Sequence, residues 1–203
     1  MKKIDFKKEL KHLYKPTPKK VESVTVPVMN FLMIDGKGDP NTSQEFMDAI
    51  DALYPVAYAL KFMVKKGGME IDYGVLPLEG LWWTDDMDNF SVDRKEDWKW
   101  TLMIMQPEFI APAMVEEAIE QVQIKKNPVS LSQLRFESYE EGEAAQIMHI
   151  GPFSEEGPTI EKVHAFIEEN GYERRGRHHE IYLSDTRKAD PAKWKTIIRQ
   201  PYS

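Results

Sequence analysis

KWTLMIMQP, residues 99–107, and KWKTIIRQP, residues 193–201, are two copies of one pattern in a chain of 203 residues. Both begin Lys-Trp and end Gln-Pro, and Lys99 is separated from Lys193 by the same interval as Gln106 from Gln200. An apolar run typical of a buried strand lies between the two ends of each copy. The spacing indicates that the chain is internally duplicated.

The segments upstream of the two copies follow one plan. A strand-like run ends in Asp35-Gly36 or Ile150-Gly151, a helix-like segment follows, and a second strand-like run then contains Glu79 or Glu180. Each half is therefore predicted to be strand, helix, strand, strand, and helices gathered on one face of antiparallel strands define an α+β fold. Two such modules packed side by side would enclose a groove along their pseudo-twofold axis, where we expect the functional site.

The pattern divides one domain, residues 1–203, into modules of about 21–109 and 131–203, joined by a linker helix of about 112–127. Pro27 predicts a bulge or edge position in the first strand, and Thr42 with Glu45 predicts a capping box for a long helix. Pro55 lies inside that helix, so we expect a kink or break just before it. An acidic excursion at residues 85–88 is expected to join a hairpin, and a turn at residues 140–142 is expected inside the strand of the second module.

Composition excludes several classes of function. The net charge of −7 opposes the phosphate backbone of nucleic acids, and the chain has no cysteine, hence no thiolate nucleophile. No run of 18 apolar residues and no signal peptide are evident, so we expect a cytoplasmic protein without a membrane partner. Eight lysines within residues 1–20 could form a membrane-seeking arm, but the helical spacing of Phe6, Leu10, Leu13 and Tyr14 favours a short docking helix with solvated lysines.

Strand alternation selects the candidate chemical groups. In residues 178–184, Ile181 and Leu183 suit the face under the helix, which would leave His178, Glu180 and Tyr182 on the opposite face. In the first copy, Glu79 shares a face with Trp83, and Trp82 points the other way. A glutamate among aromatic rings can hold a planar cation or exchange protons with a substrate. The alternative is that both glutamates are solvated and the tryptophans fill the core.

Other residues carry weaker signals. Adjacent His178 and His179 face opposite ways on a strand, and His149 and His164 suit hydrogen-bonded structural positions better than ligands. No His-x-His, His-Glu-x-x-His or carboxylate cluster points to a metal, so neither a metal nor another cofactor is expected. A serine hydrolase of the Gly-x-Ser-x-Gly type has no support.

Several stretches resemble the GyrI-like small-molecule-binding domain family. In the second half these are residues 149–153, 168–172 and 179–185, and in the first half residues 39–41, 54–58 and 77–83, which resemble the stand-alone bacterial branch. The resemblance extends from about Asp5 to the end of the chain. It implies duplicated modules around a ligand groove, the fold that also serves as the drug-sensing domain of multidrug-responsive transcription regulators. Because no DNA-binding segment precedes the domain, a transcription factor is not expected.

Some stand-alone relatives hydrolyse cyclopropane-bearing, DNA-alkylating natural products, and the resemblance extends this activity to the present chain as an expectation. Glu180 would then be the general base or water-positioning group, Tyr182 a hydrogen-bond donor to the developing phenolate, and Glu79 a second carboxylate. The ligand contacts would come from aromatic and imidazole side chains: Trp82, Trp83, Trp100, Tyr54, Phe153, His149 and His178.

Two alternatives remain open on the sequence alone. The chain could be a non-catalytic protein that binds and sequesters drugs, or a protein-interaction module like the gyrase-inhibitory relatives. In each of the three interpretations the binding partner is a small molecule or a protein, and neither nucleic acid nor a membrane is expected as a partner.

Overall fold

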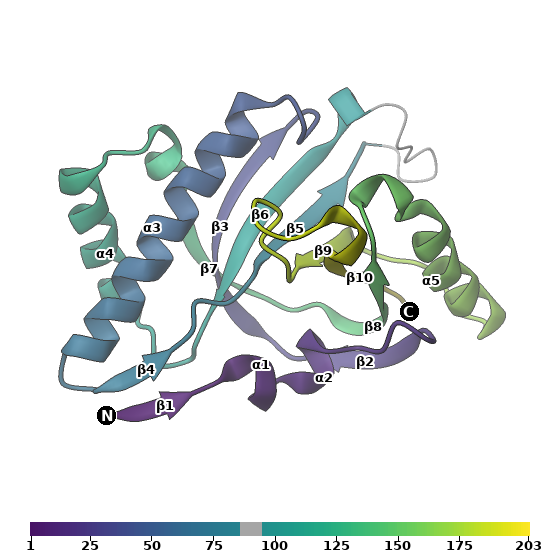
Figure 1. Cartoon of the computed structure of the whole chain (residues 1–203), viewed down its shortest axis with the longest axis horizontal. Coiled ribbons are helices and arrows are strands. Elements are labelled where there is room, and N and C mark those ends of the chain that lie inside the picture. The colour runs from purple at the N-terminus through teal and green to yellow at the C-terminus, as the bar shows by residue number, and fades with distance from the viewer. Residues whose placement is uncertain (86–94) are drawn as a thin grey trace. The chain divides into compact units, whose positions relative to one another are not determined.

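The computed structural model of the chain describes residues 1–85 and 95–203, which form two compact units (Figure 1). Unit 1 comprises Met1–Phe6, Met29–Leu76 and Trp82–Tyr139, and unit 2 comprises Lys7–Val28, Pro77–Leu81 and Glu140–Ser203. These units differ from the modules expected from the sequence, because each unit takes a strand from the other half of the chain. Of the expected acidic excursion, residues 86–88 lie outside the described residues.

Unit 1 is built on the strand β3 (Met29–Lys37), which pairs antiparallel with β6 (Lys99–Gln106) and β7 (Arg135–Tyr139). Its long helix α3 (Gln44–Lys66) lies beside α4 (Pro112–Lys125), so the expected linker helix packs within this unit (Figure 1). Two short strands, β1 (Lys2–Ile4) and β4 (Ile71–Tyr73), pair in parallel. Single turns of 3₁₀ helix at Lys95–Asp97 and Val129–Gln133 complete the unit.

Unit 2 contains four antiparallel strands in the order β2 (Glu22–Val26), β8 (Gly142–Ile150), β10 (Lys195–Pro201) and β9 (His178–Tyr182). The helix α5 (Gly157–Glu169) packs on β8 and β10. The strand β5 (Leu78–Trp83) is divided between the units, and its unit 2 residues lie next to β9. Short helical turns occur at α1 (Phe6–Glu9), α2 (Lys11–Tyr14), Phe153–Glu155 and Pro191–Lys193.

The strand registers confirm the α+β duplication. Trp100 lies opposite Gly36 in unit 1, and in unit 2 the Gly151 N–H donates to the Trp194 carbonyl at 3.0 Å. Two residue pairs further in, Ile34 faces Leu102 and His149 faces Thr196. The two copies of the opening pattern therefore occupy the same place in each unit.

The first strand of each half crosses to the other unit. β2 precedes β3 in the chain but pairs with β8, whereas β7 precedes β8 but pairs with β3. The turn expected inside one strand at residues 140–142 is thus the connection between β7 of unit 1 and β8 of unit 2. Pro27 lies at the corresponding connection between β2 and β3.

The long helix differs from its prediction at two points. It runs without interruption from Gln44 to Lys66 although Pro55 lies inside it, so the expected break does not occur. Its N-cap is Ser43, whose hydroxyl accepts from the Phe46 N–H at 3.3 Å, rather than Thr42. Burial of one face of the helix, including Leu53, stabilises the helix beyond what the missing proline donor costs.

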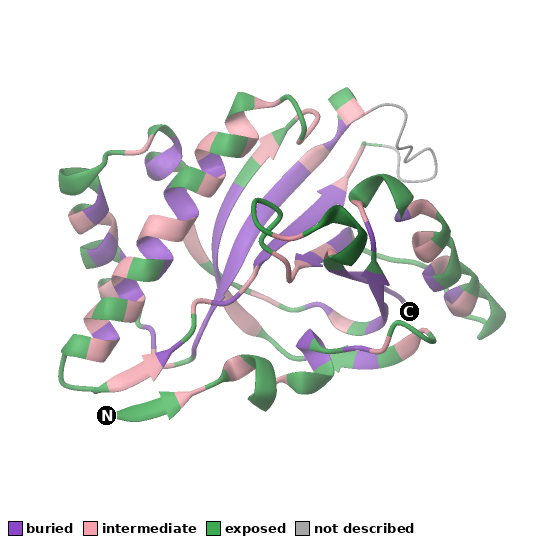
Figure 2. Ribbon diagram, in the orientation of Figure 1, coloured by how far each residue is buried: buried purple, intermediate pink, exposed green. Residues whose placement is uncertain are grey.

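Burial follows the strands (Figure 2). In unit 1, β6 and the middle of β3, residues 31–34, are buried. In unit 2 the side chains of Ile147, Ile198, Val163 and Ile167 form a core between α5 and the strands. The N-terminal segment docks as expected, with Leu13 and Tyr14 buried and its lysines exposed, but as two single-turn helices rather than one.

Candidate functional site

The side chains of His178, Glu180 and Tyr182 share the face of unit 2 that α5 covers. Glu180 lies opposite Ile198 in the register of β9 and β10, and residues paired in this way point to the same face. Ile198 packs against Val163 and Ile167 of α5. Glu180 therefore points to the α5 side.

The expectation that these three side chains lie on the face away from the helix is wrong. Both faces of β9 are covered, since His178 is buried on one face and His179 and Ile181 are buried on the other. Ile181 is fully buried on the face opposite to α5, so an apolar residue fits that face as well as the face under the helix. Apolar alternation consequently gives no indication of which face carries the helix.

The Glu180 carboxylate is held by both of its strand neighbours. His178 Nε2 lies 3.0 Å from Oε1, and the Tyr182 hydroxyl donates to Oε2 at 2.7 Å. Burial raises the pKa of Glu180, but the hydrogen bond and charge of His178, followed by the Tyr182 hydroxyl, outweigh it and leave the pKa below its ordinary value. Glu180 is thus an ionised, oriented carboxylate at neutral pH.

The Tyr182 ring, whose hydroxyl contacts this carboxylate, is the first of three neighbouring aromatic rings in unit 2. The Phe153 ring meets the Tyr182 ring at a centroid distance of 5.7 Å and the Trp194 ring at 5.0 Å. Phe153 is exposed, whereas Glu180, Tyr182 and Trp194 are half-buried. The group combines an ionised oxygen acceptor with apolar ring surface, as small-molecule sites commonly do.

Glu79 points to the other face. Its side chain is fully buried, accepts from the Tyr14 hydroxyl at 2.7 Å through Oε1, and lies 2.9 Å from His179 Nε2 through Oε2. His179 Nδ1 in turn lies 2.8 Å from Glu141 Oε1. Glu79 and Glu180 therefore do not meet, and the expectation that they face one site is not met within unit 2.

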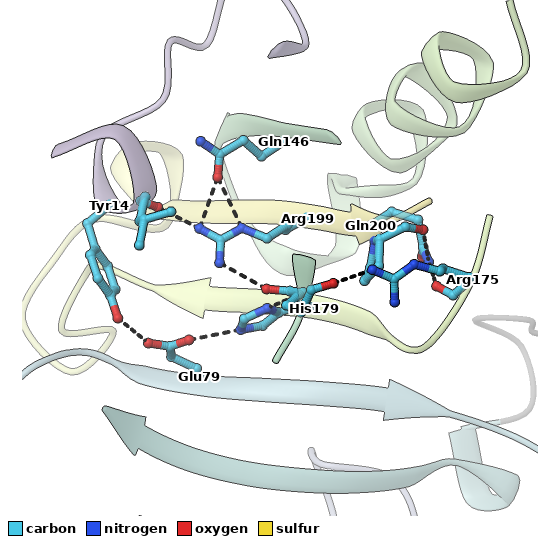
Figure 3. A network of polar contacts seen from close by, with 10 residues as sticks. Tyr14, Glu79, Gln146, Arg175, His179, Arg199 and Gln200 are labelled. Carbon is cyan, nitrogen blue, oxygen red and sulfur yellow. Dashed lines mark hydrogen bonds and ion pairs between the residues drawn. The ribbon is translucent and has the colours of Figure 1, made fainter. Parts of the chain in front are cut away.

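Figure 3 shows how the network around Glu79 continues. Arg199 donates to Glu141 Oε2 at 3.2 Å, to Gln146 Oε1 at 2.9 and 3.1 Å, and to the Leu13 carbonyl at 2.7 Å. Arg175 adds a hydrogen bond to the Glu141 carbonyl. Two carboxylates, one imidazole and one guanidinium are thus buried together, a composition in which the charges can balance.

The electrostatics of this network favour a charged imidazole. Burial lowers the pKa of His179, but Glu141 and Glu79 outweigh it and raise the pKa to about 9. Burial raises the pKa of Glu141, but His179 and Arg199 outweigh it and lower the pKa to about 2. Burial and the neighbouring Glu79 raise the pKa of the Tyr14 hydroxyl above its ordinary value.

Sequence reasoning missed this network because its members come from distant segments. Arg199 replaces Met105 of the other copy, and a charged residue in an otherwise apolar strand pattern was the one available signal. The sequence places Glu141 in a turn and predicts of His179 only that it faces away from His178. Nothing in the spacing of Tyr14, Glu79 and His179 relates them before the fold is known.

The remaining predicted histidine has a local explanation. His149 is buried, and its Nε2 faces the Pro152 carbonyl at 3.3 Å while Nδ1 lies 2.9 Å from the Thr159 hydroxyl. A carbonyl only accepts, so Nε2 donates and Nδ1 accepts from Thr159. Both ring nitrogens therefore tie the end of β8 to its own unit.

The predicted aromatic residues of the first half lie in unit 1. Trp82 and Trp100 are almost fully buried around Phe46, at ring-centroid distances of 5.9 and 5.3 Å. Trp83 is half-buried, as is Tyr54, which lies on α3 with its ring 6.4 Å from that of Tyr58. Trp82 and Trp100 are thus core residues of unit 1.

Residues 1–85 and 95–203 contain no group of three or more histidine, aspartate or glutamate side chains arranged to hold a metal ion. Within the same residues, no helix combines the length and apolar character needed to cross a membrane.

Comparison with known structures finds close likenesses. A crystal structure of a conserved protein from Listeria innocua is 45% identical, with a TM-score of 0.90 over 98% of this chain and all of that one. A hydrolase from Listeria innocua is 44% identical, with a TM-score of 0.88 over the full length of both chains. The C-terminal domain of EcmrR shares the fold at 14% identity, with a TM-score of 0.58 over 91% of this chain and 97% of that one.

No curated protein matches the chain. The sequence model of the GyrI-like small-molecule-binding domain, however, matches residues 19–203, which is nearly the whole chain. The chain belongs to the GyrI-like small-molecule-binding domain family.

Proposed function

We propose that the chain binds planar, largely apolar small molecules and hydrolyses reactive cyclopropane-containing genotoxic compounds by water addition assisted by Glu180. The observation that carries the proposal is the Glu180 carboxylate, ionised and fixed by hydrogen bonds from two neighbours at 3.0 and 2.7 Å beside exposed ring surface. A general base needs both a correct protonation state and a fixed position, and Glu180 has both.

The donors leave the carboxylate able to act on water. Each carboxylate oxygen has two lone pairs, and His178 and Tyr182 occupy one on each oxygen. A water molecule can therefore donate to Glu180 while the carboxylate keeps its orientation.

The substrate is a cyclopropane fused to a conjugated dienone. Water oxygen forms a bond to the cyclopropane carbon outside the dienone ring, and the C–C bond that joins this same carbon to the dienone ring breaks. The electron pair of that bond passes through the ring to the carbonyl oxygen, which becomes a phenolate. Glu180 accepts the water proton, and the phenolate takes up a proton to give the phenol, so the net change is addition of one water. Tyr182 suits stabilisation of the phenolate once its O–H turns from Glu180 to the ligand.

The same geometry favours hydrolysis of a neutral ligand over capture of a cation. A cationic drug would compete for the carboxylate oxygens with His178, which lies 3.0 Å from one of them. A neutral electrophile needs only ring surface, which Phe153 and Trp194 provide. The likeness to a hydrolase from Listeria innocua, at 44% identity over the full chain, supports an enzyme.

Incubation of the purified chain with a cyclopropane-bearing dienone alkylator tests the proposal. Loss of the dienone absorbance and a product heavier by one water are expected, with turnover in excess of the protein. Glu180→Gln should abolish turnover while leaving ligand binding measurable by fluorescence quenching, and the exposed Glu161 on α5 provides a control, Glu161→Gln, that should remain active.

Stoichiometric binding with unchanged ligand would instead identify a sequestering protein. If the chain neither binds nor converts the alkylator but retains gyrase on an immobilised column, the protein-interaction alternative replaces the proposal.

A further inference from the structure

The segment His12–Thr17, here termed the N-terminal strap, is held on unit 2 by side chains of the strands. Gln146 Nε2 donates to the His12 carbonyl at 2.7 Å, and Arg199 Nη2 donates to the Leu13 carbonyl at 2.7 Å. The Met148 N–H donates to the Thr17 carbonyl at 3.2 Å. Most of these contacts thus come from side chains that reach the main chain of the strap.

The Tyr14 side chain adds a further contact between the strap and unit 2. The Tyr14 ring is buried, and its hydroxyl donates to Glu79 at 2.7 Å. Leu13 is fully buried beside it, while Lys11 and Lys15 on either side are exposed. The strap therefore presents one phenol and one aliphatic side chain inward and its charges outward.

The groups that receive the strap are fixed by bonds to one another. Arg199 is held by Glu141 and Gln146, and Glu79 is held by His179, which also contacts Glu141. Arg199 and Glu79 thus contact the strap and the network at the same time (Figure 3). A set of donors and acceptors positioned in this way is what a preorganised binding site requires.

We propose that Glu79, His179, Glu141, Arg199 and Gln146 form a peptide-recognition site on unit 2, separate from the Glu180 site, which reads a Leu-Tyr segment through its carbonyls and its phenol. In this state the chain's own strap fills the site. The same segment supplied in trans, as from a second copy of this chain, is the occupant that fits it.

The site needs both the carbonyl and the phenol hydroxyl of that segment to pair its own polar groups. Without the strap, Arg199 would lose a carbonyl acceptor and Glu79 a hydroxyl donor in a place where unpaired polar groups are costly. An intact strap, however, excludes a competing peptide, because its covalent linkage gives it an effective concentration of roughly millimolar.

The test uses the full chain with the double substitution Leu13→Ala and Tyr14→Ala, and a fluorescent peptide corresponding to residues 5–20. We expect saturable binding to the variant, with Kd below about 1 mM, and none to the unaltered chain at the same concentrations. A peptide with phenylalanine in place of its tyrosine should bind about tenfold more weakly.

A scrambled peptide of the same composition controls for attraction of the lysines to the acidic chain. Equal binding of the scrambled peptide, or no binding to a variant with the circular dichroism of the unaltered chain, overturns the proposal.

A second measurement applies if the double variant does not fold. Hydrogen exchange of the single variant Tyr14→Phe should accelerate in residues 7–18 while β8 and β10 keep their protection, with Tyr172→Phe, an exposed tyrosine of the same unit, as control. Equal acceleration in the strap and in both strands would show that the strap is an inseparable part of the core, and would overturn the proposal.

Discussion

Glu79 and Glu180 come from adjacent strands of unit 2, and their carboxylates point to opposite faces of it. Glu79 is enclosed by Tyr14 and His179, whereas Glu180 lies on the α5 side with His178 and Tyr182. Two residues that match in the repeat therefore have different surroundings. One carboxylate is part of a buried network, and the other is half-buried beside ring surface.

Removing the charge of each glutamate should separate these roles. Glu79→Gln leaves the buried imidazole and guanidinium with one carboxylate between them, and we expect the free energy of unfolding to fall by about 3 kcal/mol. Glu180→Gln should lower it by less than Glu79→Gln does, because the Glu180 side chain is 13% exposed and the Glu79 side chain is 0% exposed. Urea unfolding measures both, and equal losses would contradict the assignment.

The free energy of unfolding should decrease at alkaline pH, because His179 loses its proton there. Its pKa is raised from 6.5 to about 9 in the folded state, so its contribution is fully present below pH 6.5 and is lost as the pH rises through 9. The loss should approach about 3 kcal/mol. Chemical unfolding between pH 6 and 10 measures it, and the slope should flatten in His179→Gln.

Glu141 should act in the opposite direction. Its pKa is lowered from 4.5 to about 2, so its contribution is present above pH 4.5 and is lost as the pH falls through 2. Acid unfolding of Glu141→Gln, compared with the unaltered chain, should show a smaller drop between pH 4.5 and 2. An identical acid limb in both proteins would count against the network.

Tyr182→Phe should slow the proposed reaction and shift its pH profile. We expect kcat to fall by about 10- to 100-fold, since one donor to the phenolate is lost. The Tyr182 hydroxyl also helps to lower the pKa of Glu180, so the acid limb of the rate profile should move to higher pH. Tyr172→Phe serves as control, and an unshifted acid limb would argue that Tyr182 does not act on Glu180.

Gly36→Ala should destabilise unit 1 severely. A Cβ at residue 36 would overlap the Trp100 ring, which lies over the glycine, and the ring is fully buried and unable to move aside. We expect a loss of at least about 2 kcal/mol in urea unfolding. Gly68→Ala, with no heavy atom within 4 Å of the added Cβ, is the matched control, and Trp100→Phe should partly rescue Gly36→Ala.

The repeat in the sequence was sufficient to predict the duplicated α+β fold, because both copies have the same spacing and their strands therefore pair in the same register. Leu102 and Thr196, for example, occupy the same position of two strands that pair in the same way with their neighbours. The grouping of His178, Glu180 and Tyr182 was also predictable, since alternate residues of one strand share a face.

The faces and partners of these residues were not predictable. Alternation says which side chains point together but not which layer covers them, and in unit 2 both faces of β9 are covered. The contact of Tyr14 with Glu79 joins residues 65 positions apart in the chain and depends on how a short segment docks. Such contacts have no periodic signature.

The exchange of β2 and β7 between the units has a consequence for the folding of the chain. Without these two strands, β8 and β3 would each have an unpaired edge. Neither half can then complete its sheet before the other is synthesised, so folding depends on contacts of large sequence separation, which form slowly.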